Sequence, residues 1–196
     1  MDKGDRYAGL ALAAASILSI VAMAHHPSGP SGHSGVTQLV HGAMIVIVLV
    51  NLCGFTRFAM RIGIDRFEVL CGLVAYAAAA FANVLAATIN GFAAPAAFQQ
   101  SAAQSILSFA WELNQALAIG GVNGIAVAFL LWGAALLRNG GFERWLGAGA
   151  LIVGAVTVAS LVAGFVSMNI SGAFIVYGLQ AAFGVLVGAA LMRPRS

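Results

Sequence analysis

The sequence predicts an all-α, polytopic membrane protein, a bundle of six transmembrane helices with both termini in the cytoplasm. Of its 196 residues, 61% are hydrophobic and only 8% are charged, whereas about a quarter of the residues in soluble domains are charged. Apolar runs long enough to cross a bilayer, which takes about 20 residues, occur six times along the chain. All nine Lys and Arg residues fall on one side of the resulting arrangement.

The apolar runs are separated by short segments rich in Gly, Pro, Ser and Asn, which are typical of turns. Residues 90–100 form one such segment, and we expect a loop there. Alternating strand patterns are absent and Ala, Leu and Gly dominate, so helices are favoured over a barrel. The chain is predicted to form one transmembrane domain, 1–196, with helices at about 7–24, 37–55, 67–89, 106–137, 145–166 and 172–192.

The positively charged residues give the predicted orientation. They precede the first helix, join helices two and three, join helices four and five, and end the chain. By the positive-inside rule, these segments and both termini are cytoplasmic. The net charge of +3 is therefore a topology signal, and the partner it implies is the lipid bilayer rather than a nucleic acid. The cations are Lys3, Arg6, Arg57, Arg61, Arg66, Arg138, Arg144, Arg193 and Arg195.

The N-terminal segment also fits a secretory signal. It has a basic start, an apolar run and the small-residue pattern Ala22-Met23-Ala24. Cleavage after Ala24 would make His25 the new N-terminus, whose amine and imidazole could chelate copper. We take the segment as a retained first helix.

All four histidines fall within residues 23–42, on the predicted periplasmic side. Neutral imidazole is the commonest metal ligand in proteins, so the cluster predicts a site for Zn or Cu, with a haem as the alternative cofactor. Without a metal, we expect a solvated loop in which His41 bonds to Gln38 or Glu112. The predicted ligands are His25, His26, His33 and His41.

The fourth predicted helix carries a polar stripe. Its members fall within an arc of roughly 100°, the width of one helix face, so we expect this face to look into the bundle or a wet cavity. Glu112 is the ionisable member, and ionisable groups at membrane depth mark function by default. It is our candidate catalytic residue, as a metal ligand or as a general base. The stripe comprises Ser101, Gln104, Ser105, Ser108, Glu112, Gln115 and Asn123.

Other helices carry isolated polar residues that we expect to bond across the bundle interior. Gly120 with Gly124, and Gly184 with Gly188, have the GxxxG spacing that suits close helix packing. The polar interior is predicted to contain Gln38, Asn83, Ser108, Gln115, Asn123 and Gln180.

The stretch "LLWGAALLRNGGFERWLGAGALIVG", residues 130–154, resembles the helix-loop-helix segment of a family of small bacterial six-helix inner-membrane proteins of unknown function. In that family a Gly-Phe and a later Arg-Trp-Leu-Gly join two helices at the cytoplasmic face. The resemblance implies six helices and a bacterial inner membrane, and it implies no activity.

Three functional hypotheses follow. The first is a periplasm-facing metal or redox site that acts on a small or lipophilic substrate, which would make the protein a metal-dependent membrane enzyme. The second is a proton-coupled transporter or small-solute pore that uses Glu112. The third is a non-catalytic membrane subunit or assembly factor whose polar groups only pack the bundle or a partner.

Overall fold

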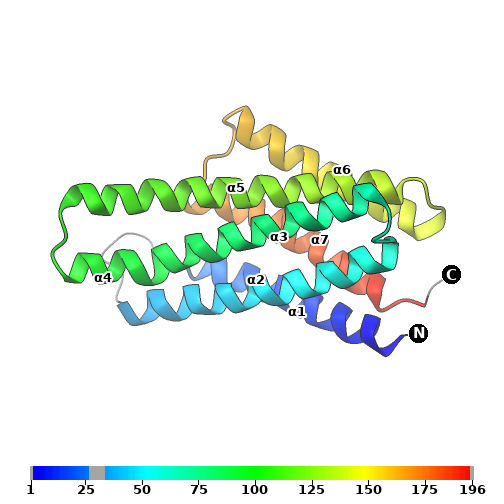
Figure 1. The fold of residues 1–196 in the computed structure, drawn as a ribbon, viewed down its shortest axis with the longest axis horizontal. Coiled ribbons are helices and arrows are strands. Elements are labelled where there is room, and N and C mark those ends of the chain that lie inside the picture. Colours follow the sequence, from blue (N-terminus) through cyan, green and yellow to red (C-terminus); the bar gives the residue numbers. More distant parts are fainter. Residues whose placement is uncertain (1, 27–33, 195–196) are drawn as a thin grey trace.

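The computed structural model describes residues 2–26 and 34–194, and in this part of the chain every regular element is a helix (Figure 1). The all-α prediction is confirmed. Six segments are long and apolar enough to span a membrane. They are fewer than the helical elements, because the third segment, Phe67–Gln99, is continuous and comprises three consecutive elements. The elements are α1 (Lys3–Ala24), α2 (Ser34–Ile62), α3 (Phe67–Thr88), the π-helical turn η1 (Ile89–Ala93), α4 (Ala94–Gln99), α5 (Gln104–Leu136), α6 (Gly141–Val162) and α7 (Ile170–Leu191).

Two helices extend beyond their predicted ends. α2 continues from the expected end near residue 55 to Ile62, so Arg57 and Arg61 lie on a helix rather than in a loop. The prediction of a loop at residues 90–100 is wrong, because most of these residues belong to η1 and α4. Pro95 stands just after η1, inside the continuous segment Phe67–Gln99, and has no N–H to donate to the preceding turn.

The helices pack in a sequential ring. α1 lies between α2 and α7, α3 lies between α2 and α5, and α6 packs mainly on α5. Both chain termini and the α2–α3 and α5–α6 turns lie at one end of the bundle, which we call the terminal end (Figure 1). The opposite end, which we call the α4 end, contains α4 and the start of α5.

An aromatic cluster fills the terminal half of the bundle. Trp132 is fully buried at its centre and donates its indole N–H to the carbonyl of Val69 at 3.1 Å. The ring of Phe55 stacks on Trp132 with centroids 5.6 Å apart. The cluster thus joins four helices in one packed layer. Its members are Phe55, Phe58, Tyr76, Phe129, Trp132 and Phe183.

Small residues let α1 and α7 touch along their backbones. A Cβ placed on Gly9 would lie 2.5 Å from the carbonyl oxygen of Gly188, and one on Gly188 would lie 2.6 Å from that of Gly9. Gly184 packs equally closely on Ser16 of α1. The GxxxG pair of α7 therefore forms a helix interface. Gly120 and Gly124 of α5 do not form such an interface together, because a Cβ on Gly120 would meet no neighbouring atom.

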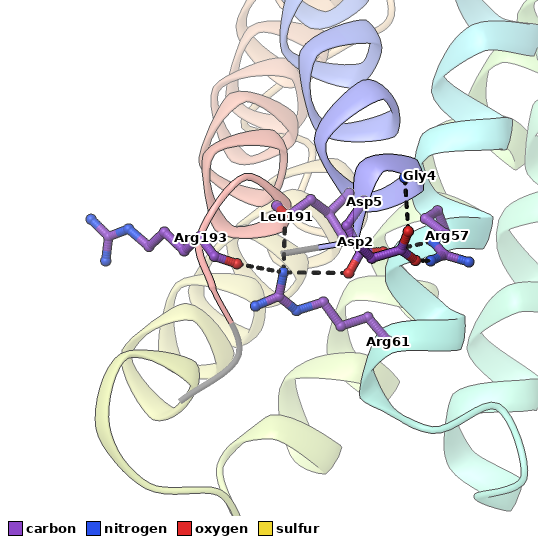
Figure 2. A network of polar contacts seen from close by, with 7 residues as sticks. All are labelled: Asp2, Gly4, Asp5, Arg57, Arg61, Leu191 and Arg193. Carbon is purple, nitrogen blue, oxygen red and sulfur yellow. Dashed lines mark hydrogen bonds and ion pairs between the residues drawn. The ribbon is translucent and has the colours of Figure 1, made fainter.

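An ion-pair network, which we call the Asp5 network, joins α1, α2 and α7 at the terminal end (Figure 2). Asp5 is only 3% exposed and accepts a hydrogen bond from Nε of Arg57 at 2.6 Å. Arg57 also pairs with Asp2, the N-cap of α1. Arg61 donates to the carbonyl of Leu191 at 3.0 Å, so a cation stabilises the C-terminal end of α7.

Candidate functional site

The α4 half of the bundle encloses a cavity of about 580 Å³. Every helical element except α6 contributes to its wall, and Phe55, Tyr76 and Phe129 of the aromatic cluster line it toward the terminal end. Aliphatic and aromatic side chains alternate on the wall with polar ones. The polar lining residues besides the tyrosines and Trp111 are Ser16, Ser19, His26, Thr37, His41, Asn51, Asn83, Asn90, Gln104, Ser108, Glu112, Asn114, Gln115 and Gln180.

His41 is almost fully buried on this wall, at 2% exposure. Its Nδ1 lies 2.8 Å from the backbone carbonyl of Thr37, and a carbonyl only accepts, so Nδ1 carries the proton. Nε2 then accepts a hydrogen bond from the carboxamide nitrogen of Asn90 at 3.2 Å. The ring of His26 meets that of His41 edge to face, with centroids 4.8 Å apart. His41 is therefore a neutral imidazole whose two nitrogens are both bonded.

The π turn η1 places Asn90 against His41. Single π-helical turns inside α-helices occur frequently at functional sites. Gly91 follows Asn90, and a Cβ there would lie 2.3 Å from Cβ of His41. The backbone of η1 is thus in direct contact with α2, and only glycine fits at this point. The expected partners of His41, Gln38 and Glu112, do not form its bonds, and Gln38 is exposed.

The histidines do not form the predicted metal site in the described part of the chain. Nε2 of His41, the nitrogen that a metal or a haem iron would need, is bonded to Asn90. Nδ1 of His25 is bonded to the carbonyl of Val21 at 2.9 Å. Within residues 2–26 and 34–194, no group of three or more His, Cys, Asp or Glu could hold a metal ion. His33 lies outside the described residues. The described residues therefore give no support to a Zn, Cu or haem site.

The polar stripe of α5 borders the cavity with its N-terminal half. Gln104, Ser108, Glu112 and Gln115 line the wall, whereas Ser101, Ser105 and Asn123 do not. The side chain of Glu112 is exposed rather than buried in the bundle interior, so it borders the cavity from an exposed position. His41 and Glu112 thus border one cavity without bonding to each other.

Two of the predicted interior residues link helices across the cavity wall. Asn83 of α3 accepts a hydrogen bond from the hydroxyl of Tyr177 on α7 at 2.8 Å. Gln180 of α7 donates through Nε2 to the carbonyl of Val122 on α5 at 3.1 Å. Both residues are buried. These bonds set the spacing between α3, α5 and α7 at mid-bundle.

Three side-chain oxygens on the wall have no hydrogen-bond partner among the described residues. They are Oγ1 of Thr37, Oδ1 of Asn51 and Oε1 of Gln180. Thr37 is 8% exposed and Gln180 is 6% exposed, so neither is solvated at the surface. Because nearly all buried polar groups in proteins are hydrogen-bonded, these three oxygens are exceptions among the buried polar atoms of the wall.

Sequence reasoning missed several of these residues. Asn51 interrupts an apolar run as Asn83 does, so the same signal could have identified it. Asn114 is buried and lines the cavity, although it falls outside the arc of the α5 stripe. Thr37 offered no signal, because a threonine near a helix start is unremarkable. Comparisons with protein-family models, curated proteins and solved structures find no match for this chain.

Proposed function

We propose that this is a multi-pass protein of the bacterial cell membrane whose cavity binds a small, largely apolar molecule. The observation that carries this proposal is the cavity of about 580 Å³, which lies within the range of about 300–1,000 Å³ typical of ligand pockets. Such pockets are mostly apolar and have a few polar groups that fix the orientation of the ligand. Polar side chains on the wall, among them Asn90, Gln104 and Gln115, supply those groups.

With both termini in the cytoplasm, the α4 end faces the periplasm, and the ligand enters from that side. The aromatic cluster packs the bundle beneath the cavity, which favours a binding site that is closed toward the cytoplasm over an open pore. The proton-coupled transporter is the alternative, and it rests on Glu112, the acidic residue at the cavity rim.

The test is binding of a neutral probe, 4-phenylbutanol, to the purified protein in phosphatidylcholine nanodiscs. Isothermal titration calorimetry, with empty nanodiscs subtracted, measures the affinity. Ala118→Phe adds a ring to the cavity wall on α5 and is expected to abolish binding. The matched control is Ala155→Phe, which adds the same ring to the exposed surface of α6, outside the cavity.

Thermal unfolding of both variants checks that they remain folded. Absence of binding to the unmodified protein, or equal binding by the two folded variants, would contradict the proposal.

A further inference from the structure

We infer that the ligand of this cavity is a lipophilic organic cation, an ammonium group attached to an apolar body. This inference rests on the proposed function, since it adds a charge to the apolar molecule that the cavity is proposed to bind. Two features of the wall carry it: its charge and its aromatic floor.

The charge of the wall favours a cation. Glu112 is the acidic residue among the lining residues, and none of the described residues that line the cavity is Lys or Arg. The described cations lie outside the cavity wall, and in the Asp5 network Arg57 is already paired with Asp2 and Asp5. The lining imidazole of His41 is neutral, with its proton on Nδ1 and its Nε2 bonded to Asn90. A carboxylate facing low-dielectric walls attracts cations and repels anions.

The floor of the cavity suits both parts of the ligand. Phe55, Tyr76 and Phe129 line the cavity toward the terminal end, and they bring apolar area for the body of the ligand. The negative faces of aromatic rings also attract cations that come within about 6 Å of the ring centroid. An anion gains nothing from these faces.

The test uses three probes of nearly equal shape: 4-phenylbutylamine, 4-phenylbutanol and 4-phenylbutanoate. Each is titrated into the full chain in nanodiscs of zwitterionic phosphatidylcholine, near neutral pH and at constant ionic strength. The amine is expected to bind about tenfold more tightly than the alcohol, the size expected for opposite charges a few ångströms apart in a partly hydrated site. The carboxylate is expected not to bind.

Glu112→Gln is the decisive variant. Because Glu112 is exposed, removing its charge is expected to leave the fold intact. The variant is expected to bind the amine about tenfold more weakly while its affinity for the alcohol is unchanged. Glu112→Asp keeps the charge and is expected to retain the preference for the amine. The matched control is Asp65→Asn, which removes the same charge from the exposed α2–α3 turn and is expected to change neither affinity.

The two proposals fail in different ways. If the alcohol binds and the amine binds no more tightly, or if Glu112→Gln weakens both probes equally, the ligand is not a cation while the cavity remains a binding site. If none of the three probes binds, the proposed function itself fails. Tight binding of the carboxylate would also overturn the inference.

Discussion

The carboxamide of Asn90 donates a hydrogen bond to Nε2 of His41 across 3.2 Å, and this bond joins the π turn η1 to α2. The contact is made possible by Gly91, whose missing side chain leaves room for the imidazole. The wall of the cavity is therefore held together at this point by one hydrogen bond and one close backbone approach.

Gly91→Ala is expected to lower the free energy of unfolding by about 2 kcal/mol, because the new methyl group would overlap His41 and overpacking typically costs 1–3 kcal/mol. Thermal unfolding followed by tryptophan fluorescence in detergent measures the change. Gly120→Ala is the matched control, since a Cβ there meets no neighbour. It is expected to leave stability unchanged or to raise it by up to about 1 kcal/mol. Equal losses in the two variants would contradict the close contact.

Asp5→Ala is expected to lower the free energy of unfolding by about 2 kcal/mol. Breaking a buried ion pair costs about 3–5 kcal/mol and an exposed pair about 0–1, and the Asp5 network lies between these cases, because Asp5 is buried while Arg57 is partly exposed. The same unfolding measurement applies. Asp65→Ala at the exposed α2–α3 turn serves as the control and should change stability by less than about 0.5 kcal/mol. An unaltered midpoint for Asp5→Ala would rule out a stabilising network.

Gln180→Met and Asn83→Leu are expected to differ in their effects on stability. Gln180→Met loses one hydrogen bond to Val122, but it also removes an unpartnered buried oxygen, so the change should stay within about 1 kcal/mol. Asn83→Leu leaves the buried hydroxyl of Tyr177 without its acceptor and is expected to cost about 1–2 kcal/mol. Denaturant titrations of the two variants, prepared in the same detergent, measure the difference. A larger loss for Gln180→Met than for Asn83→Leu would reverse this assignment.

The predicted orientation can be tested with reporter fusions in a bacterial host. Green fluorescent protein fused to the C-terminus is expected to fluoresce, because the positive-inside rule predicts that the cation-rich terminal end is cytoplasmic. Alkaline phosphatase is expected to be active when fused after residue 102, between α4 and α5, and inactive when fused after residue 139, between α5 and α6. The opposite pattern of phosphatase activity would invert the orientation.

The six apolar segments could be predicted from the sequence because length and hydropathy are local properties of the chain. The position at which α2 ends could not be predicted in this way. Hydropathy ends the helix where Arg57 and Arg61 begin to appear, yet the helix continues because Arg57 is paired with Asp5, 52 positions earlier in the chain. A pairing over such a distance depends on how the helices pack, and one sequence does not reveal it.

The candidate site could be predicted in part. His41 and Glu112 were singled out as polar residues at membrane depth, and both line the same cavity. The partner of His41 could not be predicted, because a π turn inserts one extra residue into a helix and rotates the side chains around it out of the α-helical register. The metal prediction relied on four histidines being close in sequence, whereas the described residues contain no group of three or more His, Cys, Asp or Glu that could hold a metal ion, and Nε2 of His41 is bonded to Asn90.

The two halves of the bundle differ in how tightly they are filled: the terminal half holds the aromatic cluster and the Asp5 network, and the α4 half holds the cavity. Local opening costs least where few buried contacts must be broken. Backbone amides of α5 before Ala118 should therefore exchange with deuterium faster than those after Ile125, and a bound ligand should slow the first set alone. The terminal half is then expected to keep its structure when a ligand binds, and conformational changes are expected in the α4 half alone.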